Sequence, residues 1–404
     1  MNYRHHYHAG NFADVMKHAV LVQLVRALQR KDKGFLYLDT HAGRGGYDLL
    51  AARRGDTLAR TPEHPGGIGR LLSEWHGQPA RDSATREPVL MSKFQNHRLA
   101  ARATTSQPSF PYAGETNIPP ALADYLRLVR DFDRRSGNLD PNAIRYYPGS
   151  PCLVRALMRP QDRMALCELH PAEFQSLRDE FQNRASTLLS TDEKPWRARL
   201  RDSDWERRLP AGRRRAASPE STKPAGKMPA LPVAVASFDE PFKTTENPKQ
   251  TDASGNSTPA VSIHEMDGYT ALRAMLPAQE KRALVLIDPP YEARDEYEKI
   301  TRSLRDALRR MNAATYAVWY PLTERARADE FLDRLAMLNP PPTLAVELTI
   351  AGESTALKMR GCGLAVINPP WQIDQTLPPL LAALSRRLAQ APGAKSTLAW
   401  LVRE

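Results

Sequence analysis

The sequence predicts an α/β fold built on a seven-stranded, mostly parallel sheet. Seven short apolar runs alternate with amphipathic segments, which is typical of a parallel sheet covered by helices on both faces. Several runs are followed by an acid or amide and then by glycine or proline, so polar groups should gather at the carboxyl ends of strands. The clearest run, 284–287, precedes Asp288-Pro289-Pro290-Tyr291. Because prolines lack the N–H that a sheet ladder needs, they end this strand at Asp288.

Composition and charge favour a globular protein with an anionic partner. The 404 residues are 41% hydrophobic, and the net charge of +11 suits nucleic acid, although a merely basic protein has the same balance. The three cysteines lie far apart without a C-x-x-C, so neither a disulfide framework nor a zinc site is indicated. Residues 1–5 contain no apolar signal core and no apolar run approaches membrane-spanning length, so we expect neither a signal peptide nor a membrane span. We therefore expect a cytoplasmic monomer with no metal and no membrane partner.

The first strand leads into a glycine-rich turn. A polar, histidine-rich arm occupies positions 1–12, and a helix should follow from about Asn11 or Asp14, both suitable caps. The strand at 35–38 ends at Asp39, and Gly43 and Gly45 complete the pattern D-x-x-x-G-x-G. Cofactors that contain adenosine need such a turn, because glycine lets the backbone approach the ligand closely. Alone the pattern is weak, and the dinucleotide fingerprint G-x-G-x-x-G is absent.

The middle of the chain is interrupted by two irregular segments. Short helices are predicted at 68–75 and 121–132, and Ser150 should cap a helix that begins at Pro151 and ends at about Arg159. Residues 78–117 and 191–259 lack periodicity and are rich in Ser, Thr and Pro, so we predict that they are flexible insertions.

The second and third strands also end in acids. The strand at 163–167 precedes Glu168, which could accept hydrogen bonds from ribose hydroxyls, and the strand at 261–265 precedes Asp267 and Gly268. The usual interval from the glycine turn to such an acid is about 20 residues. Here it is far longer, so residues 51–150 must be an excursion between strands one and two. Otherwise Glu168 is simply a solvated strand end.

Further helices are predicted at 172–189, 268–275, 297–311 and 324–338, and further strands at 315–320, 344–350 and 363–367. The last strand ends in Asn368-Pro369-Pro370-Trp371. This segment and 288–291 both match D/N-P-P-aromatic, a pattern typical of enzymes that methylate exocyclic amino groups. Strand order separates them. The fourth strand should lie beside the first, at the switch point where ligands bind, whereas the seventh lies farther away. We therefore predict that Asp288 is the catalytic residue.

The chemistry expected at this motif is methylation of an adenine amino group. Asp288 and the carbonyl of Pro289 would accept hydrogen bonds from the amine and increase electron density on its nitrogen, while Tyr291 stacks on the base. S-Adenosylmethionine would donate the methyl group, so catalysis is mainly orientation and electrostatics. The base must be unpaired or flipped out, and the amine then releases a proton, which Asp288 could take.

These residues resemble a family of bacterial enzymes that methylate an adenine N6 of 23S ribosomal RNA, the large-subunit methyltransferase J type. The resemblance covers nearly the whole chain outside the two insertions. The shared segments are Tyr3-Arg4-His5, 8–11, Asp14-Val15, Lys17-His18, 35–43, 145–151, 168–171, Asp267-Gly268, 287–291 and 367–371. The insertions at 78–117 and 191–259 depart from the family pattern, as do Arg44 and Gly46 in the glycine turn.

The resemblance implies a Rossmann-like, S-adenosylmethionine-dependent fold. Residues 1–50 and 146–404 would form the core, with a small helical subdomain, 51–145, inserted after strand 1. The implied cofactor contacts are Lys17, His18, His41, Ser150, Glu168, Asp267 and Gly268. Asp288, Pro289 and Tyr291 would be catalytic, and Tyr3 and Arg4 would contact 23S ribosomal RNA. Two alternatives stay open, namely a DNA adenine-N6 methyltransferase and a basic RNA-binding protein without catalysis.

Overall fold

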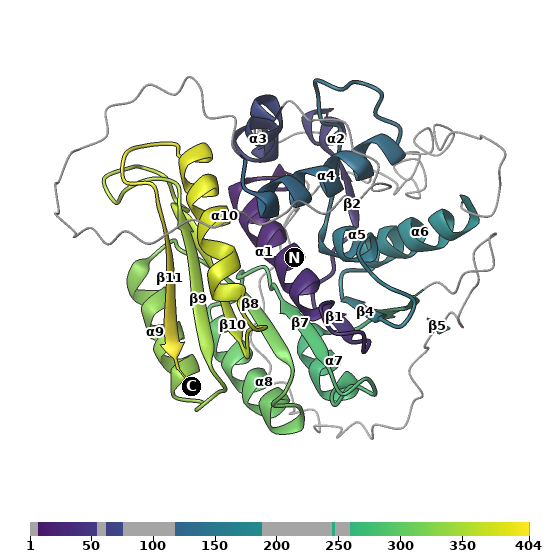
Figure 1. Cartoon of the computed structure of the whole chain (residues 1–404), viewed down its shortest axis with the longest axis vertical. Coiled ribbons are helices and arrows are strands. Elements are labelled where there is room, and N and C mark those ends of the chain that lie inside the picture. The colour runs from purple at the N-terminus through teal and green to yellow at the C-terminus, as the bar shows by residue number, and fades with distance from the viewer. Residues whose placement is uncertain (1–6, 55–61, 76–117, 188–244, 247–258, 404) are drawn as a thin grey trace, which may run out of the picture.

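The structure, a computed structural model, describes residues 7–54, 62–75, 118–187, 245–246 and 259–403. Nine strands of the described part form one sheet, in which neighbouring strands follow the order β11-β9-β10-β8-β7-β1-β4-β6-β5 (Figure 1). In that order they are β11 (Lys395–Val402), β9 (Thr343–Thr349), β10 (Gly361–Ile367), β8 (Thr315–Pro321), β7 (Ala283–Ile287), β1 (Leu36–Asp39), β4 (Arg163–Glu168), β6 (Ala260–Glu265) and β5 (Thr245–Glu246).

All seven predicted strands are present, and the order of the central ones is as predicted. Five neighbouring strands, β6, β4, β1, β7 and β8, run parallel, and β7 lies directly beside β1. The predicted seventh strand, β10, runs antiparallel between β8 and β9. Two edge strands were not predicted. β11 pairs antiparallel with β9, and the two-residue β5, inside the segment 191–259 that we expected to be flexible, pairs with β6.

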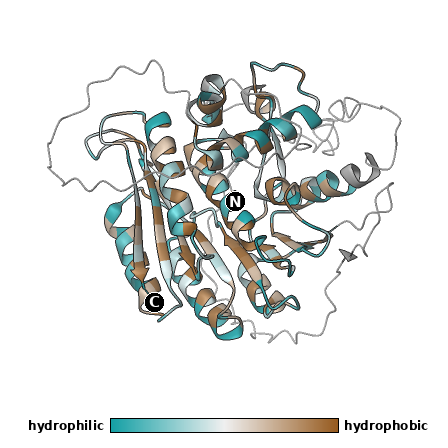
Figure 2. Cartoon of the chain, in the orientation of Figure 1, coloured by the Kyte–Doolittle hydropathy of each residue, from teal (hydrophilic) through white to brown (hydrophobic). Residues whose placement is uncertain are grey.

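Helices cover both faces of the sheet. On one face pack α1 (Phe12–Leu28), α4 (Pro120–Arg135), α5 (Ser150–Arg155), α6 (Pro171–Thr187) and α10 (Ile373–Arg387). On the other pack α7 (Gly268–Met275), α8 (Glu296–Arg310) and α9 (Arg325–Ala336). The strands are mostly apolar, whereas the helices turn polar stripes outward (Figure 2). The arrangement is therefore the α/β layering that the alternating pattern predicted.

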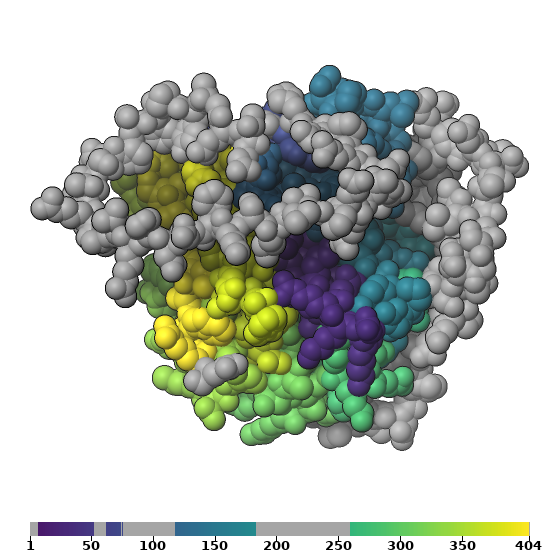
Figure 3. All heavy atoms as spheres, in the orientation of Figure 1, coloured from purple at the N-terminus to yellow at the C-terminus, as the bar shows by residue number. Residues whose placement is uncertain are grey.

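Helix α1 is buried along most of its length. The side chain of Asn11 caps it by accepting hydrogen bonds from the backbone N–H groups of Ala13 and Asp14, as predicted. The helix packs against α4, α5, α10 and β10, and its first fourteen residues are all buried. In the space-filling view the N-terminal segment (purple) lies between the C-terminal segment (yellow) and the segment with α5 and α6 (teal) (Figure 3). Polar side chains on α1 therefore need partners inside the protein.

The start of α5 corrects one sequence prediction. Gly149, not Ser150, occupies the N-cap position, and the helix ends at Arg155 rather than at about Arg159. The hydroxyl of Ser150 donates a hydrogen bond to Asp39 across the sheet edge, so it is not used as a cap. A tertiary partner has therefore replaced the local one that helix statistics favour.

The excursion after β1 is closed by a short two-stranded sheet. β2 (Gly46–Asp48) pairs antiparallel with β3 (Tyr146–Pro148), which brings the two ends of the excursion together. Between them the structure describes α2 (Leu49–Arg54), the 3₁₀ turn η2 (His64–Gly66), α3 (Ile68–Glu74) and α4. The predicted flexible segment 78–117 lies outside the described residues. Because α4 packs on α1 and α10, a separate subdomain at 51–145 stays a prediction.

Cys152, Cys167 and Cys362 are free and buried. None of the helices that the structure describes is both long enough and apolar enough to cross a membrane.

Candidate active site

Acidic side chains line the carboxyl edge of the parallel strands. Asp39 is level with Leu166 of β4 and Leu286 of β7, so Glu168 and Asp288 both lie two residues beyond it on the flanking strands. Asp267 follows β6 at the same edge. The sheet therefore brings together the strand-end acids that the sequence pointed to. No group of three or more His, Cys, Asp and Glu able to hold a metal ion occurs in the described part of the chain.

Asp288 is paired with a buried lysine of α1. The Nζ atom of Lys17 lies 2.5 Å from Oδ2 of Asp288 and 2.9 Å from Oδ1 of Asp14. Burial alone would lower the pKa of the Lys17 ammonium, but the two carboxylates outweigh burial and hold its pKa well above the ordinary value. Lys17 is therefore a permanent cation at this site, and it fixes the orientation of the Asp288 carboxylate.

Two hydrogen-bond acceptors at this motif have no donor among the described residues. Lys17 contacts Oδ2 of Asp288, and no described residue donates to Oδ1. The carbonyl of Pro289 likewise accepts no hydrogen bond from the described part of the chain. The side chain of Asp288 keeps 18% of its surface exposed. A bound amino group with two N–H donors could satisfy both acceptors at once.

Tyr291 belongs to an aromatic cluster beside Asp288. Its ring lies 5.1 Å from the ring of Tyr297 and 5.6 Å, edge to face, from that of Trp319. Its hydroxyl donates a hydrogen bond to the Trp319 carbonyl. Its backbone adopts a positive φ of 53°, which side chains other than glycine rarely adopt. The ring is therefore held in one place at the end of β7 and stays partly exposed.

Asp39 is fully buried and is satisfied by two hydroxyls. Its Oδ2 atom accepts hydrogen bonds from Ser150 at 2.7 Å and Tyr37 at 2.8 Å. Burial raises the pKa of Asp39 to about 6, and these hydrogen bonds offset part of the rise. Ser150, a predicted cofactor contact, therefore lies at the carboxyl edge and ties the start of α5 to β1.

The glycine turn and Glu168 hold one another. Gly43 and Gly45 both have positive φ, 61° and 86°, which glycine adopts without strain. The N–H of Gly43 donates to Oε2 of Glu168 at 2.8 Å, and the N–H of His170 donates to Oε1 at 2.7 Å. Burial raises the pKa of Glu168, while these two N–H groups act in the opposite direction. The carboxylate is thus oriented at the mouth of the turn.

Asp267 and Gly268 follow β6, and Gly268 packs closely against Thr40 at the end of β1. Asp267 caps α7 by accepting from the backbone N–H of Thr270 at 2.8 Å. A Cβ atom at Gly268 would lie 2.2 Å from the Thr40 carbonyl oxygen, so only glycine fits there. The ring of His41 packs edge to face on Tyr269 at 5.5 Å. Burial lowers the pKa of His41, while the carboxylates of Asp288, Asp267 and Glu296 act in the opposite direction.

The side chain of His18 contacts the excursion after β1. Its Nδ1 atom lies 2.7 Å from the hydroxyl of Tyr147 on β3, which in turn lies 3.0 Å from the hydroxyl of Tyr125 on α4. All three side chains are buried. His18 therefore connects the helix that carries Lys17 to the polypeptide between β1 and β4.

The end of the N-terminal arm, just before α1, contacts the excursion after β1. Tyr3 and Arg4 lie outside the described residues, so their predicted RNA contacts stay predictions. The end of the arm is anchored by Glu63, whose Oε2 atom contacts His8 at 3.0 Å and accepts from Asn11 at 2.8 Å. Burial of Glu63 acts to raise its pKa, but these hydrogen bonds outweigh burial and lower it.

The second D/N-P-P-aromatic segment lies at the opposite edge of the sheet. Ile367 of the antiparallel β10 is level with Tyr316, which places Asn368 beside Thr315, at the start of β8. The side chain of Asn368 donates to the Ala313 carbonyl at 2.9 Å, and its own carbonyl accepts from Thr315. Asn368 therefore lies away from Asp288, as predicted, although the antiparallel direction of β10, which was not predicted, is what places it at the opposite edge.

Sequence reasoning missed several residues of this site. It gave Asp14 only a possible role as a helix cap, and it assigned none to Tyr147 or to Glu296, which accepts from the Tyr269 hydroxyl at 2.6 Å. The i, i+3 spacing of Asp14 and Lys17 on one helix was a signal that could have found the first. Nothing local indicates the other two, because their partners are distant in the sequence.

The chain is similar to proteins of one family. A family model described as "Ribosomal RNA large subunit methyltransferase D, RlmJ" matches residues 110–215 and 252–402. The chain is 29% identical to "Ribosomal RNA large subunit methyltransferase J" of Escherichia coli (strain K12) and 26% identical to the protein of that name from Haemophilus influenzae, and both comparisons cover 100% of each chain. The crystal structure of protein LPL1258 from Legionella pneumophila is 26% identical, with a TM-score of 0.59 and 97% of both chains covered.

Proposed function

The chain belongs to the RlmJ family of ribosomal RNA large subunit methyltransferases, and from that premise we propose that it methylates the N6 amino group of an adenine in 23S ribosomal RNA with S-adenosylmethionine. The position of Asp288 carries the proposal. It follows the strand beside β1, where open α/β sheets bind ligands, and it offers an unused oxygen next to the unused carbonyl of Pro289.

The carboxyl edge fits S-adenosylmethionine. The two glycines with positive φ put no side chain at two positions of the turn, and the half-buried Glu168 carboxylate accepts the N–H of Gly43 there, where it could also accept from ribose hydroxyls. Lys17, His18, His41, Ser150, Glu168, Asp267 and Gly268 are the residues that we propose hold the cofactor. Glu168 and Asp267, strand-end acids that are not paired with Lys17, also favour a cationic sulfonium. When bound, the cofactor supplies an electrophilic methyl group.

Asp288 and Pro289 would orient the reacting amine. The lone pair of an adenine amine is delocalised into the ring, so the nitrogen is a weak nucleophile. Oδ1 of Asp288 and the carbonyl of Pro289 would each accept one N–H, which increases electron density on nitrogen and fixes its direction. The amine becomes cationic as it is methylated, and Asp288 would receive the proton that it then releases.

Lys17 would keep Asp288 in its working geometry. The ammonium binds only Oδ2, so Oδ1 is free for the amine. It also offsets the repulsion between Asp14 and Asp288, both of which it contacts. Tyr291 would support the flipped base by stacking, and the aromatic cluster holds its ring for that purpose.

RNA would reach this edge from the N-terminal arm and the excursion. Glu63 anchors the arm just before α1, so Tyr3 and Arg4, which lead into it, are proposed to contact the substrate. Residues 51–145 are proposed as the helical subdomain that docks RNA. The positive charge of +11 suits that role.

Labelled methyl transfer tests the proposal. The full chain is incubated with labelled S-adenosylmethionine and either unmodified large-subunit ribosomal RNA or DNA, and the product nucleosides are identified. We expect N6-methyladenosine from the RNA only. Incorporation into DNA alone would establish the DNA adenine alternative, and RNA binding without any incorporation would establish a non-catalytic binding protein.

A further inference from the structure

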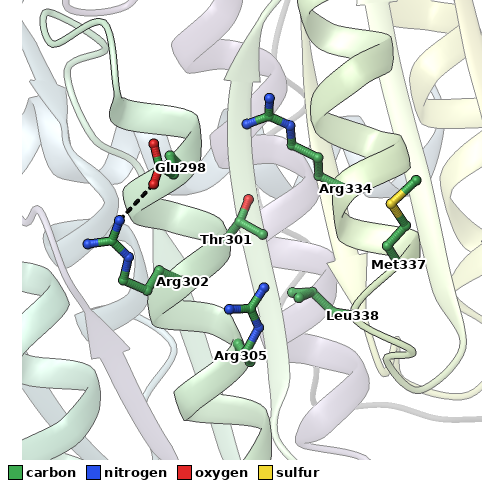
Figure 4. Close-up of a pocket in the computed structure, with 7 residues that line it drawn as sticks. All are labelled: Glu298, Thr301, Arg302, Arg305, Arg334, Met337 and Leu338. Carbon is green, nitrogen blue, oxygen red and sulfur yellow. Dashed lines mark hydrogen bonds and ion pairs between the residues drawn. The ribbon is translucent and has the colours of Figure 1, made fainter.

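An arginine-lined trough runs between α8 and α9, on the face of the sheet that α1 does not cover. It consists of two cavities of about 250 and about 340 Å³ that share Arg305, Met337 and Leu338 in their walls. Figure 4 shows the first cavity, with Arg302 and Arg305 from one helix and Arg334 from the other. The two cavities are neighbours that share these walls, and together we call them the α8–α9 trough.

The trough carries uncompensated positive charge. Four guanidinium groups and one carboxylate, that of Glu298, line it, a net charge of +3. Arg302 pairs with Glu298 at 2.7 Å and Arg334 pairs with Glu330 at 2.6 Å. Arg305 and Arg309 have no acidic partner within the described part of the chain.

The spacing of these arginines points to a ligand. Arg302, Arg305 and Arg309 stand at i, i+3 and i+7, so they form one stripe along α8. Like charges four residues apart on a helix repel, so an anion bound between Arg305 and Arg309 would relieve that repulsion. Arginine also presents a planar fork of donors that matches the oxygens of a phosphate.

The trough starts close to the catalytic edge. Tyr297, in the first turn of α8, packs on Tyr291, and Arg309 lies twelve residues further along the helix. At about 1.5 Å per residue, the stripe extends about 18 Å away from the aromatic cluster. Met337, which is 82% exposed, adds an apolar surface to its rim. A polyanion with apolar bases, bound at Tyr291, could therefore continue along α8.

We propose that the α8–α9 trough binds the sugar–phosphate backbone of the RNA substrate, at a contact separate from the Asp288 pocket. This inference rests on the proposed function, because it names a second surface for the same substrate. The repeated phosphates fit a stripe of arginines along a helix, and bases can lie on Met337. An acidic protein segment is the competing occupant.

The test removes the two unpaired arginines. The double variant Arg305→Ala/Arg309→Ala is compared with the full wild-type chain for binding of unmodified large-subunit ribosomal RNA at several salt concentrations. We expect an affinity about tenfold lower and a salt slope less negative by roughly 1 to 2, since about one phosphate contact is lost per arginine. The rate at saturating RNA and the affinity for S-adenosylmethionine should stay within about twofold of wild type, because neither arginine is near Asp288.

Matched variants complete the design. Arg386→Ala/Arg403→Ala removes two exposed arginines elsewhere and should leave the salt slope unchanged. Arg305→Lys keeps the charge and should keep most of the affinity. Unchanged RNA affinity and slope in the trough variant would overturn the inference and leave an acidic protein as the occupant. A wild-type chain that methylates no RNA would instead refute the proposed function, so the two failures are distinguishable.

Discussion

Two segments of this chain share a sequence pattern but occupy opposite edges of the sheet. Asp288 and Asn368 each follow a buried strand, and each precedes two prolines and an aromatic residue. β7 runs parallel to its neighbours and β10 runs antiparallel, so the ends of the two strands point in opposite directions. Asn368 is level with the start of β8, and Asp288 lies about 13 Å further along the strands and about 10 Å across them.

The same helix region reaches both segments. Lys17, near the start of α1, binds Asp288, and Arg30, just past its end, donates to the Trp371 carbonyl at 3.3 Å. Thirteen residues separate them, which corresponds to about 20 Å of helix. The first contact is buried and pairs two charges, whereas Trp371 is 78% exposed. The two similar motifs therefore lie in different surroundings, although both contact α1 or the residues just after it.

The hydrogen bonds of the two segments differ, and this difference separates the candidate site from the loop that shares its motif. The hydrogen-bonding groups of Asn368 are paired within the protein, since its backbone N–H donates to the Pro342 carbonyl and its side chain donates to the Ala313 carbonyl. At the other segment, Oδ1 of Asp288 and the Pro289 carbonyl accept no hydrogen bond from any described residue, and a buried cation orients the carboxylate. Unused, oriented hydrogen-bonding groups at the switch point distinguish the candidate site, because the sequence letters are nearly the same.

The largest difference between the two segments should be catalytic. Asp288→Ala removes an acceptor for the amine, so we expect methyl transfer to ribosomal RNA to fall about 10³-fold at unchanged S-adenosylmethionine affinity. Initial rates with labelled cofactor and equilibrium binding measure the two quantities. Asn368→Ala serves as the matched variant. If Asp288→Ala kept full activity and Asn368→Ala lost it, the assignment of the two edges would be reversed.

The second prediction concerns pH, because the carboxyl edge carries Asp39, a fully buried acid whose pKa is raised, whereas the residue at the other edge is an asparagine. The pKa of Asp39 is raised from 3.8 to about 6, so the folded state binds this proton more tightly than the unfolded state. The associated stability is fully present below pH 3.8 and is lost as pH rises through about 6. Two pKa units correspond to about 3 kcal/mol. Asparagine does not titrate, so Asp39→Asn removes this dependence.

Urea unfolding from pH 3.5 to 8 measures that effect. The free energy of unfolding of the wild type minus that of Asp39→Asn should fall by about 2.5 kcal/mol between pH 4 and pH 7. The pH-independent effects of the substitution cancel in the slope. A flat difference would mean that Asp39 has an ordinary pKa, and that the carboxyl edge is no more sensitive to pH than the edge with Asn368.

The sequence predicted much of this contrast but could not predict its cause. Strand order followed from the apolar runs and placed Asp288 beside β1. The antiparallel direction of β10 has no local signature, because a buried run reads the same in either direction. α10 was missed since Pro378 and Pro379 interrupt its pattern, and β11 since its sides alternate between exposed and half-buried.

The residues of the candidate site also divide into those that the sequence could predict and those that it could not. Asp288 and Glu168 were predictable because each ends a strand, and parallel strands end at a common edge. The ion pair between Lys17 and Asp288 was not, because 271 residues separate them. Ser150 was expected at the edge through family resemblance, but its contact with Asp39 overrode the helix-capping role that local statistics favoured.

A smaller effect is expected at the structural segment. Asn368 has a positive φ of 51°, which asparagine tolerates better than alanine. Asn368→Ala loses the hydrogen bond to Ala313 and adds strain, so it should lower the free energy of unfolding by about 2 kcal/mol. Asn368→Gly loses the bond without the strain and should cost about 1 kcal/mol. Urea unfolding measures both, and equal losses would show that strain plays no part.

The smallest expected difference separates the two aromatic residues. The Tyr291 hydroxyl donates to the Trp319 carbonyl, so Tyr291→Phe should lower the free energy of unfolding by about 1 kcal/mol, whereas Trp371→Phe, at an exposed position, should change it by less than about 0.5 kcal/mol. Since the proposed base contact is stacking, Tyr291→Phe keeps the ring and should retain methyl transfer within about threefold. A large rate loss in Tyr291→Phe would show instead that the hydroxyl, by fixing the ring on β8, sets the geometry in which the base meets Asp288.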